Sequence, residues 1–164
     1  MAHEIRTFGD PVLKSRATPV KDFDESLERL AEDMMRIMRE NEGAGLAANQ
    51  IGRLKRIFVA AYEDEEFAIV NPVIEERSEA LEKDVEGCLS IPEIRVEVER
   101  PRAVTVSGKD PSGAPVRVRA EDRLARIFQH EIDHLDGILM LDRTDRESRK
   151  NALREIRERL LTRG

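Results

Sequence analysis

The sequence predicts an α+β fold, in which antiparallel β-sheets pack around a central helix, with one helix near the N-terminus and one at the C-terminus. Apolar residues recur every three or four positions in three separate segments. The region between the first two of these segments has the pattern of short strands joined by turns. No repeat, low-complexity tract or linker interrupts the 164 residues, so we expect residues 1–164 to form a single domain.

The N-terminal part predicts an extended segment followed by a helix. Residues 1–20 contain turn formers and little periodicity, and we expect them to wrap around the domain. Apolar side chains then fall three and four positions apart, and residues 41–43 end the pattern. The methionines in this helix would suit a ligand groove, but we interpret them as core packing. The periodic side chains are Leu27, Leu30, Ala31, Met34, Met35, Ile37 and Met38.

Five segments in the middle of the chain have the pattern of strands. Residues 56–62 and 67–70 flank an acidic stretch, which we interpret as the solvated turn of an antiparallel hairpin. Residues 94–98 alternate apolar and charged side chains, as a half-buried strand does. Residues 103–107 and 116–119 predict a second hairpin across a turn that contains proline and glycine.

Two further helices complete the predicted fold. The central helix spans residues 121–136, with acidic residues in its first turn and Gly137 at its end. Its apolar face also carries Glu131, so we expect this carboxylate on the buried side. The last helix begins with the capping-box pattern Thr144-x-x-Glu147. We expect it to bury Leu153, Ile156 and Leu160.

Composition indicates a folded protein of a reducing compartment. The chain is 40% hydrophobic and 38% charged, with a net charge of −6 and a mean hydropathy of −0.53. No apolar stretch approaches the length of a membrane span, and the first residues lack the apolar run of a signal peptide. One cysteine cannot form an intrachain disulfide. We therefore expect a cytoplasmic protein without a membrane partner.

The C-terminal helix is basic although the chain as a whole is acidic. Residues 143–164 hold eight basic and four acidic residues, a net charge of +4, which leaves −10 for the rest of the chain. Such a tail suits docking to an anionic partner such as RNA. Pairs four residues apart, such as Glu155 with Arg159, equally fit a solvated helix, and we favour this interpretation.

Residues 129–137 place the pattern His-Glu-x-x-His on the predicted central helix. Residues four apart lie on one face of a helix, so His130 and His134 can present two imidazole nitrogens to one metal ion. Glu131 lies one position round from His130, where a general base belongs if the metal activates a water molecule. The pattern also occurs by chance in amphipathic helices, but here both histidines share one face of a clear helix.

Cys88 is the candidate for a third metal ligand. It is the only cysteine and lies in Glu86-Gly87-Cys88-Leu89-Ser90, among residues that favour a tight turn. A lone cysteine is more often a small buried apolar residue. Three protein ligands with an open position are typical of a hydrolytic metal site, whereas four are typical of a structural one. His3 is the sole remaining histidine, and we favour the open site.

A hydrolytic site also needs hydrogen-bond donors for the oxyanion that forms on the attacked carbonyl group. One candidate is the side-chain amide of Gln50, at the end of the glycine-rich segment 43–50. The backbone N–H of Leu89, directly after Cys88, is another. By themselves, Gln50 would be an ordinary polar residue and the glycines would be turn formers.

Three segments resemble, in order, the three motifs of the peptide deformylase family. The segments are Gly43-Ala44-Gly45-Leu46-Ala47-Ala48-Asn49-Gln50, Glu86-Gly87-Cys88-Leu89-Ser90 and Gln129-His130-Glu131-Ile132-Asp133-His134. Gly9-Asp10-Pro11-Val12-Leu13 and Arg100-Pro101 are also similar to that family, so the resemblance covers nearly the whole chain. Three motifs in this order are highly specific, whereas one alone would not be.

The resemblance implies a metal-dependent hydrolase that removes the N-formyl group from the N-terminal methionine of newly synthesised polypeptides and releases formate. The family's natural metal is usually Fe²⁺, often replaced by Zn²⁺, Ni²⁺ or Co²⁺, and a donor set of one Cys and two His accepts several of these ions. The residues implied are the metal ligands Cys88, His130 and His134, the catalytic residues Glu131, Gln50 and Leu89, and the substrate-binding residues Gly43, Ala44, Gly45, Glu86, Gly87, Arg95 and Ile127.

The resemblance also implies partners and leaves alternatives. The C-terminal helix looks like that of the subgroup whose last helix docks at the ribosome, and no DNA partner is expected. Ala44 and Asn49 depart from the family pattern, in which a branched apolar residue and Pro or Thr are frequent. These departures bear on substrate preference rather than on the reaction. Ala44 leaves open a relative that acts on another small amide, and the basic tail leaves open an RNA-binding protein with a structural metal.

Overall fold

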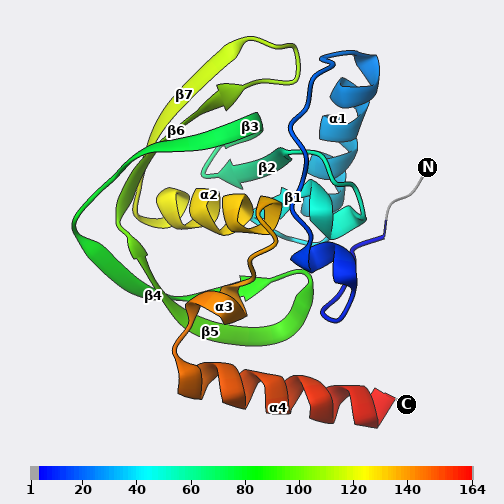
Figure 1. Cartoon of the computed structure of the whole chain (residues 1–164), viewed down its shortest axis with the longest axis vertical. Helices are drawn as coiled ribbons and strands as arrows, with labels where there is room; N and C mark the ends of the chain where they lie inside the picture. Colours follow the sequence, from blue (N-terminus) through cyan, green and yellow to red (C-terminus); the bar gives the residue numbers. More distant parts are fainter. Residues whose placement is uncertain (1–3, 164) are drawn as a thin grey trace.

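The computed structural model describes residues 4–163 and has the predicted α+β architecture (Figure 1). Within these residues, five strands form one antiparallel sheet in the order β1-β2-β3-β6-β7, and two strands form an antiparallel β4–β5 ribbon. α2 runs between the sheet and the ribbon (Figure 1). The strands are β1 (Gly45–Ala47), β2 (Ile57–Tyr62), β3 (Glu65–Arg77), β4 (Leu81–Cys88), β5 (Ile91–Pro101), β6 (Ala103–Lys109) and β7 (Pro115–Glu121). The helices are α1 (Glu25–Glu40), α2 (Asp122–Leu135), α3 (Met140–Arg143) and α4 (Arg146–Arg163), with 3-10 helices at Pro11–Lys14 and Ala48–Ile51.

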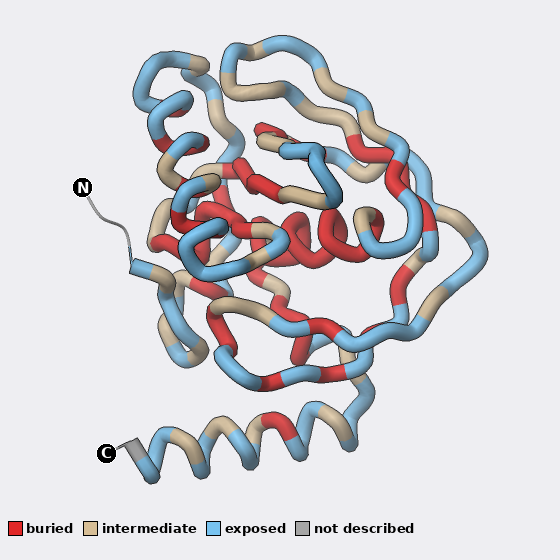
Figure 2. Tube along the Cα trace, turned by 180° about the vertical axis from the view of Figure 1, so that it is seen from behind, coloured by how far each residue is buried: buried red, intermediate tan, exposed pale blue. Residues whose placement is uncertain are grey.

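The central helix α2 is buried along most of its length (Figure 2). Every residue from 125 to 135 is buried, because the sheet covers one face of the helix and the ribbon covers another. On the sheet side, the Phe128 ring meets Phe58 and Phe67 edge-on, with ring centroids 5.5 and 5.1 Å apart. Glu131 is 4% exposed, which confirms its expected place on the buried side.

A Schellman motif ends α2 at the predicted glycine. Gly137 has a φ of +74°, its N–H donates to the His134 carbonyl at 3.0 Å, and the N–H of Ile138 donates to the Asp133 carbonyl at 2.9 Å. A Cβ at Gly137 would lie 2.6 Å from the carbonyl oxygen of Lys14. The glycine therefore lets the N-terminal segment pass close to the end of α2.

The helix predicted after the N-terminal segment is α1. Asp24 caps it by accepting the N–H of Leu27 at 3.1 Å. Met34 and Met38 are 0% and 1% exposed and pack against β1 and β2, so the methionines of α1 are core residues as expected. The segment before α1 is not wholly extended, because residues 11–14 form a 3-10 helix.

Both predicted hairpins are present, as β2–β3 and β6–β7. The predicted strand at residues 94–98 is the centre of β5, which extends further at both ends. Its partner β4 was not predicted. Most residues of β4 are exposed or half-buried and many are charged, and Glu86 and its neighbours show no apolar alternation. Pairing with β5 over eight residue pairs, rather than apolar burial, makes this segment a strand.

Two predictions about the C-terminal helix were wrong. Asp145, rather than Thr144, caps α4 by accepting the N–H of Ser148 at 2.7 Å, because the Thr144 hydroxyl donates instead to the Glu97 carbonyl of β5 at 2.6 Å. Leu160 is 64% exposed, since the apolar contacts of α4 end before it. The side chains that do pack are Ala152, Leu153 and Ile156. Among the helices of residues 4–163, none combines the length and apolar character needed to cross a membrane.

Candidate metal centre and substrate cavity

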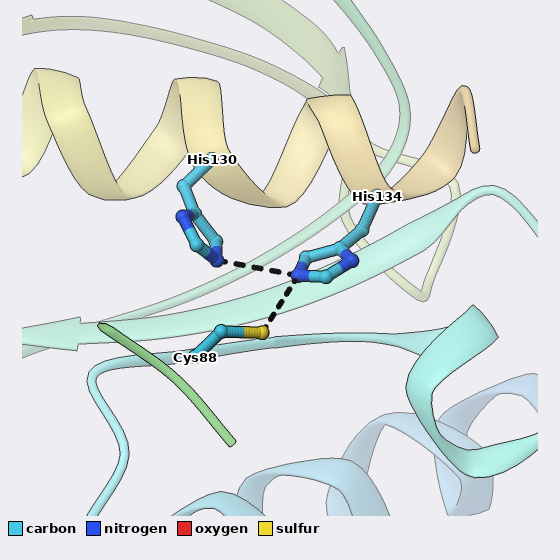
Figure 3. A group of neighbouring side chains, drawn as sticks. All are labelled: Cys88, His130 and His134. Atoms are coloured by element: carbon cyan, nitrogen blue, oxygen red, sulfur yellow. Dashed lines mark hydrogen bonds between the residues drawn. The ribbon is translucent and has the colours of Figure 1, made fainter. Parts of the chain in front are cut away.

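Three potential metal-donor atoms meet between α2 and the end of β4 (Figure 3). His130 and His134 project from one face of α2, with their Nε2 atoms 3.2 Å apart. The Sγ of Cys88 lies 3.3 Å from Nε2 of His134. All three donor atoms lie within 4.8 Å of one another, both imidazoles are buried, and Cys88 is half-buried. The fold thus brings together the three residues that the sequence singled out as ligands.

The position of Cys88 follows from the turn that connects β4 to β5. β4 ends at Cys88, and the two residues Leu89 and Ser90 lead directly into β5. Ser90 is fully buried, and its carbonyl accepts the backbone N–H of Phe8 at 2.8 Å. Its hydroxyl accepts a hydrogen bond from Nε2 of Gln50 at 3.1 Å. The N-terminal segment and the 3-10 helix before β2 therefore hold this turn against α2.

Glu86 orients the His130 ring. Its Oε1 lies 2.8 Å from Nδ1 of His130, and Arg100 donates to both of its oxygens at 2.5 and 2.9 Å. Burial raises the pKa of Glu86, but the hydrogen bonds from Arg100 and His130 outweigh burial and hold that pKa well below its usual range. An ionised carboxylate only accepts hydrogen bonds, so Nδ1 of His130 is the donor, and the other ring nitrogen, Nε2, is the one that faces His134.

A buried network of ion pairs extends from Glu86 into α2, and it was not predicted from the sequence. Arg100 also donates to Asp133 at 2.9 Å, and Arg143 of α3 donates to both oxygens of Asp133 at 2.9 and 3.1 Å. Arg126 donates to Glu86 at 2.7 Å. Arg126 and Asp133 lie on the apolar central helix, and charged residues at buried helix positions were the signal that could have revealed them.

Glu131 lies at the cavity beside the donor atoms without a hydrogen-bond partner. Its Oε1 is buried and unpaired, and no residue in the range 4–163 donates to either of its oxygens. Burial raises the pKa of Glu131 to about 7, although attraction to His130 lowers it. A carboxyl group that titrates near neutral pH can accept a proton and return it.

The side chain of Gln50 is fixed beside Cys88. Its Oε1 accepts the N–H of Ala47 at 2.9 Å, and its Nε2 donates to the Ser90 hydroxyl. The same Nε2 lies 3.6 Å from Sγ of Cys88. Gln50 is 2% exposed, so its amide is buried with a defined orientation. Leu89, the other candidate donor, follows Cys88 in the turn and also lines the cavity.

A cavity of about 560 Å³ opens beside the donor atoms. Its walls come from the loop before β1, from the β4–β5 ribbon and from the face of α2 that carries Ile127 and His130. It is lined by every residue for which the sequence predicted a metal-binding, catalytic or substrate-binding role, except His134. These lining residues are Gly43, Ala44, Gly45, Gln50, Glu86, Gly87, Cys88, Leu89, Arg95, Ile127, His130 and Glu131.

The residues present fit a divalent transition metal. One thiolate and two imidazoles form a donor set that suits Zn²⁺ and Fe²⁺. Burial and the neighbouring His130 hold the pKa of His134 well below its usual value, so this ring is neutral, which is the form that binds metals. The unpaired Oε1 of Glu131 indicates a partner from outside the chain at this point. His3, the other histidine, lies outside the described residues.

Comparisons with known proteins show the family to which the chain belongs. The family model described as polypeptide deformylase matches residues 2–150. Peptide deformylase 1 of Corynebacterium glutamicum is 49% identical over 158 residues, which cover 94% of each chain. The crystal structure of peptide deformylase from Thermus thermophilus has a TM-score of 0.91 at 44% identity and covers 98% of this chain and 96% of that one. The structure from Legionella pneumophila has a TM-score of 0.92 at 37% identity and covers 100% and 99%. The chain therefore belongs to the polypeptide deformylase family, an enzyme family that removes formyl groups from N-terminal methionine.

Proposed function

We propose that this chain is a metal-dependent hydrolase that removes the N-formyl group from the N-terminal methionine of newly synthesised polypeptides. The observation that carries the proposal is the meeting of Cys88, His130 and His134 beside a cavity that also contains Glu131. Three protein donors of this kind are typical of a hydrolytic metal site with an open coordination position. Membership of the polypeptide deformylase family supports the type of reaction.

In this proposal, Cys88, His130 and His134 hold one divalent metal ion, Fe²⁺ natively, with Zn²⁺, Ni²⁺ or Co²⁺ as substitutes. The bound metal supplies Lewis acidity for the activation of water and of the formyl carbonyl. The chain itself supplies the orientation of the ligands. Glu86 fixes the His130 ring, and Arg100 links Glu86 to α2 through its contact with Asp133.

Glu131 acts as the general acid and base. It accepts a proton from the attacking water as the water oxygen bonds to the formyl carbon. It then donates that proton to the methionine nitrogen as the C–N bond breaks, which yields formate and a free amine. Its burial, and the lack of a hydrogen-bond donor to it among residues 4–163, support this role because they leave the carboxylate available for proton transfer.

Gln50 and the backbone N–H of Leu89 stabilise the oxyanion of the tetrahedral intermediate. Donors that are fixed before the reaction need no reorganisation when the negative charge develops. The hydrogen bonds of Gln50 to Ala47 and Ser90 support its role, because they hold the amide nitrogen beside Cys88 before substrate binds.

The cavity receives the formyl-methionine, and the rest of the peptide leaves past its rim. Its volume of about 560 Å³ is within the range of small-ligand sites, roughly 300–1,000 Å³. Ile127 supplies an apolar wall from α2, and Arg95 of β5 lies beside the path of the peptide. The other substrate-binding residues in this proposal are Gly43, Ala44, Gly45, Glu86 and Gly87.

Because its proposed substrates are newly synthesised polypeptides, the enzyme acts in the cytoplasm. In this proposal, residues 1–164 form one domain. The basic α4 lies at the edge of the molecule, with one side on β5 and the other exposed, and this supports docking to the ribosome (Figure 1). No membrane or DNA partner is part of the proposal.

The test uses enzyme purified without oxygen, with metal content and hydrolysis measured on the same sample. We expect a stoichiometric amount of metal and release of formate from a formyl-Met-Ala-Ser peptide, with little hydrolysis of acetyl-Met-Ala-Ser. Equal rates on both peptides would exclude a dedicated deformylase and favour a broader amide hydrolase, consistent with the small Ala44 at the rim. Hydrolysis of neither peptide, together with RNA binding that requires residues 144–164, would instead indicate an RNA-binding protein.

A further inference from the structure

Gly45 lies directly against the Glu131 side chain. It is the first residue of β1 and lines the cavity. A Cβ at Gly45 would lie 2.6 Å from Oε2 of Glu131, 2.9 Å from its Cδ and 2.9 Å from its Cγ. Real Cβ atoms essentially never approach another heavy atom within 3.0 Å. The absence of a side chain at Gly45 is therefore the condition for Glu131 to lie where it does.

Neither backbone can easily move to accommodate a methyl group at this position. β1 pairs with β2 through Gly45 and Ala60, and the next two residues of β1 are 0% exposed. On the other side, α2 is buried from residue 125 to residue 135. Close-packed interiors resist such shifts. An added methyl group would therefore displace the Glu131 side chain rather than the strand or the helix.

Packing, together with electrostatic attraction to His130, restrains the Glu131 carboxylate in place of hydrogen bonds. No described residue donates a hydrogen bond to it, and its Oε1 is buried without a partner. The neighbouring functional groups differ in this respect, because Gln50 is held by Ala47 and Ser90 through hydrogen bonds. A change in packing at Gly45 therefore acts on a Glu131 side chain that no described residue anchors by a hydrogen bond.

We infer that Gly45 is a positioning residue for the general base, because its missing side chain forms the space that holds the Glu131 carboxylate beside the three metal-donor atoms. This inference rests on the proposed function, in which Glu131 transfers the proton. Gly43, the other glycine of the same loop, does not have this relationship. A Cβ there would lie 2.8 Å from Cδ1 of Leu89, so it would meet an apolar side chain rather than the Glu131 carboxylate.

A double-mutant cycle of Gly45→Ala and Glu131→Ala, measured by urea unfolding, tests the inference. Glu131→Ala removes the Cγ, Cδ and Oε2 atoms that the added methyl group would meet. In the wild-type background, we expect Gly45→Ala to lower kcat by about 10²-fold, the loss expected for a misplacement of ~1 Å, with a much smaller change in KM. In the Glu131→Ala background, the same change should shift the urea midpoint much less than it does in the wild-type background.

Two readouts do not depend on turnover. Metal content should stay at the wild-type level in Gly45→Ala, because none of the three donor residues is displaced. A crystal structure of Gly45→Ala should show the Glu131 carboxylate moved away from residue 45 while β1 and α2 keep their positions.

The inference is wrong if Gly45→Ala keeps the wild-type kcat, if the two substitutions act independently, or if the loss of activity follows a loss of metal. If Gly45→Ala does not fold, the double variant decides. If the double variant folds, the added methyl group and the Glu131 side chain compete for the same space. If it also misfolds, that competition is excluded. A wild-type enzyme that does not hydrolyse formyl-methionine peptides would remove the proposed function, while a displaced Glu131 in the variant structure would still establish the packing relationship.

Discussion

The Glu86 carboxylate lies 2.8 Å from Nδ1 of His130, so a residue of the β4–β5 ribbon orients the imidazole ring of His130 on α2. The same carboxylate accepts hydrogen bonds from Arg100 and Arg126, and Arg100 continues to Asp133 on α2. All of these groups are buried. Removal of one member would leave buried charges without a partner, which is strongly destabilising. The network therefore ties the orientation of the His130 ring to the packing of the ribbon on α2.

Glu86→Gln should weaken metal binding by about 10–100-fold, because the orienting partner of a ligand histidine loses its charge. Competition with a chelator of known affinity measures the change. Glu82→Gln is the matched control on the same strand, since the Glu82 carboxylate only approaches the exposed Arg102, at 3.9 Å. Equal metal affinity in the two variants would show that Glu86 does not support His130.

The stability contributed by Glu86 should decrease in acid. Its folded-state pKa is lowered from the ordinary value of 4.5, so its contribution is complete above that value and is lost as the pH falls below it. In the metal-free protein, the difference in the free energy of unfolding between wild type and Glu86→Gln should therefore shrink between pH 7 and pH 3. Urea unfolding at several pH values measures it, and a constant difference would contradict an ionised Glu86.

Glu131→Gln should keep the metal and lose formyl-methionine hydrolysis by roughly 10²–10⁴-fold, the range for loss of a general acid–base group. The amide has nearly the shape of the carboxylate but cannot accept the proton. Stability should not fall, because no described residue donates to the native carboxylate. Full activity together with full metal content would remove the assigned role of Glu131.

Two apolar residues one turn apart in α4 should differ in their effect on stability. Ile156→Ala should lower the free energy of unfolding by about 1–2 kcal/mol, because Ile156 is half-buried against the core on β5. Leu160→Ala should change it by less than about 0.5 kcal/mol, since Leu160 is 64% exposed. Urea unfolding measures both, and a larger loss in Leu160→Ala would place the apolar face of α4 elsewhere.

Charge reversal on α4 should separate ribosome docking from catalysis. Arg154 and Arg157 are exposed and form no ion pair within residues 4–163. Replacing both with glutamate should reduce co-sedimentation with ribosomes at low salt and leave hydrolysis of a free formyl-methionine peptide unchanged. Replacing Glu147 and Glu158 with glutamine is the opposite control. Unchanged co-sedimentation in the Arg154 and Arg157 variant would exclude this face of α4 as the docking surface.

Features that depend on neighbouring residues were predictable from the sequence. The apolar periodicity of α1 and α2 and the turns of the two hairpins are local patterns, and the structure confirms these elements. Features at element boundaries were less predictable. The Thr144 hydroxyl bonds to β5 instead of capping α4, and β4 is a strand because β5 pairs with it. Neither partner lies close in the sequence.

That His130 and His134 share a helix face with Glu131 beside them can be read from the sequence, because helical spacing is a local property. Three other relationships come from tertiary packing. The Cys88 thiol reaches those rings, Glu86 and Arg100 orient one of them, and Gly45 leaves space for the carboxylate. These relationships join segments far apart in the chain. They depend on how the sheet and the ribbon pack on α2. A local sequence pattern does not show which distant segments pack against each other.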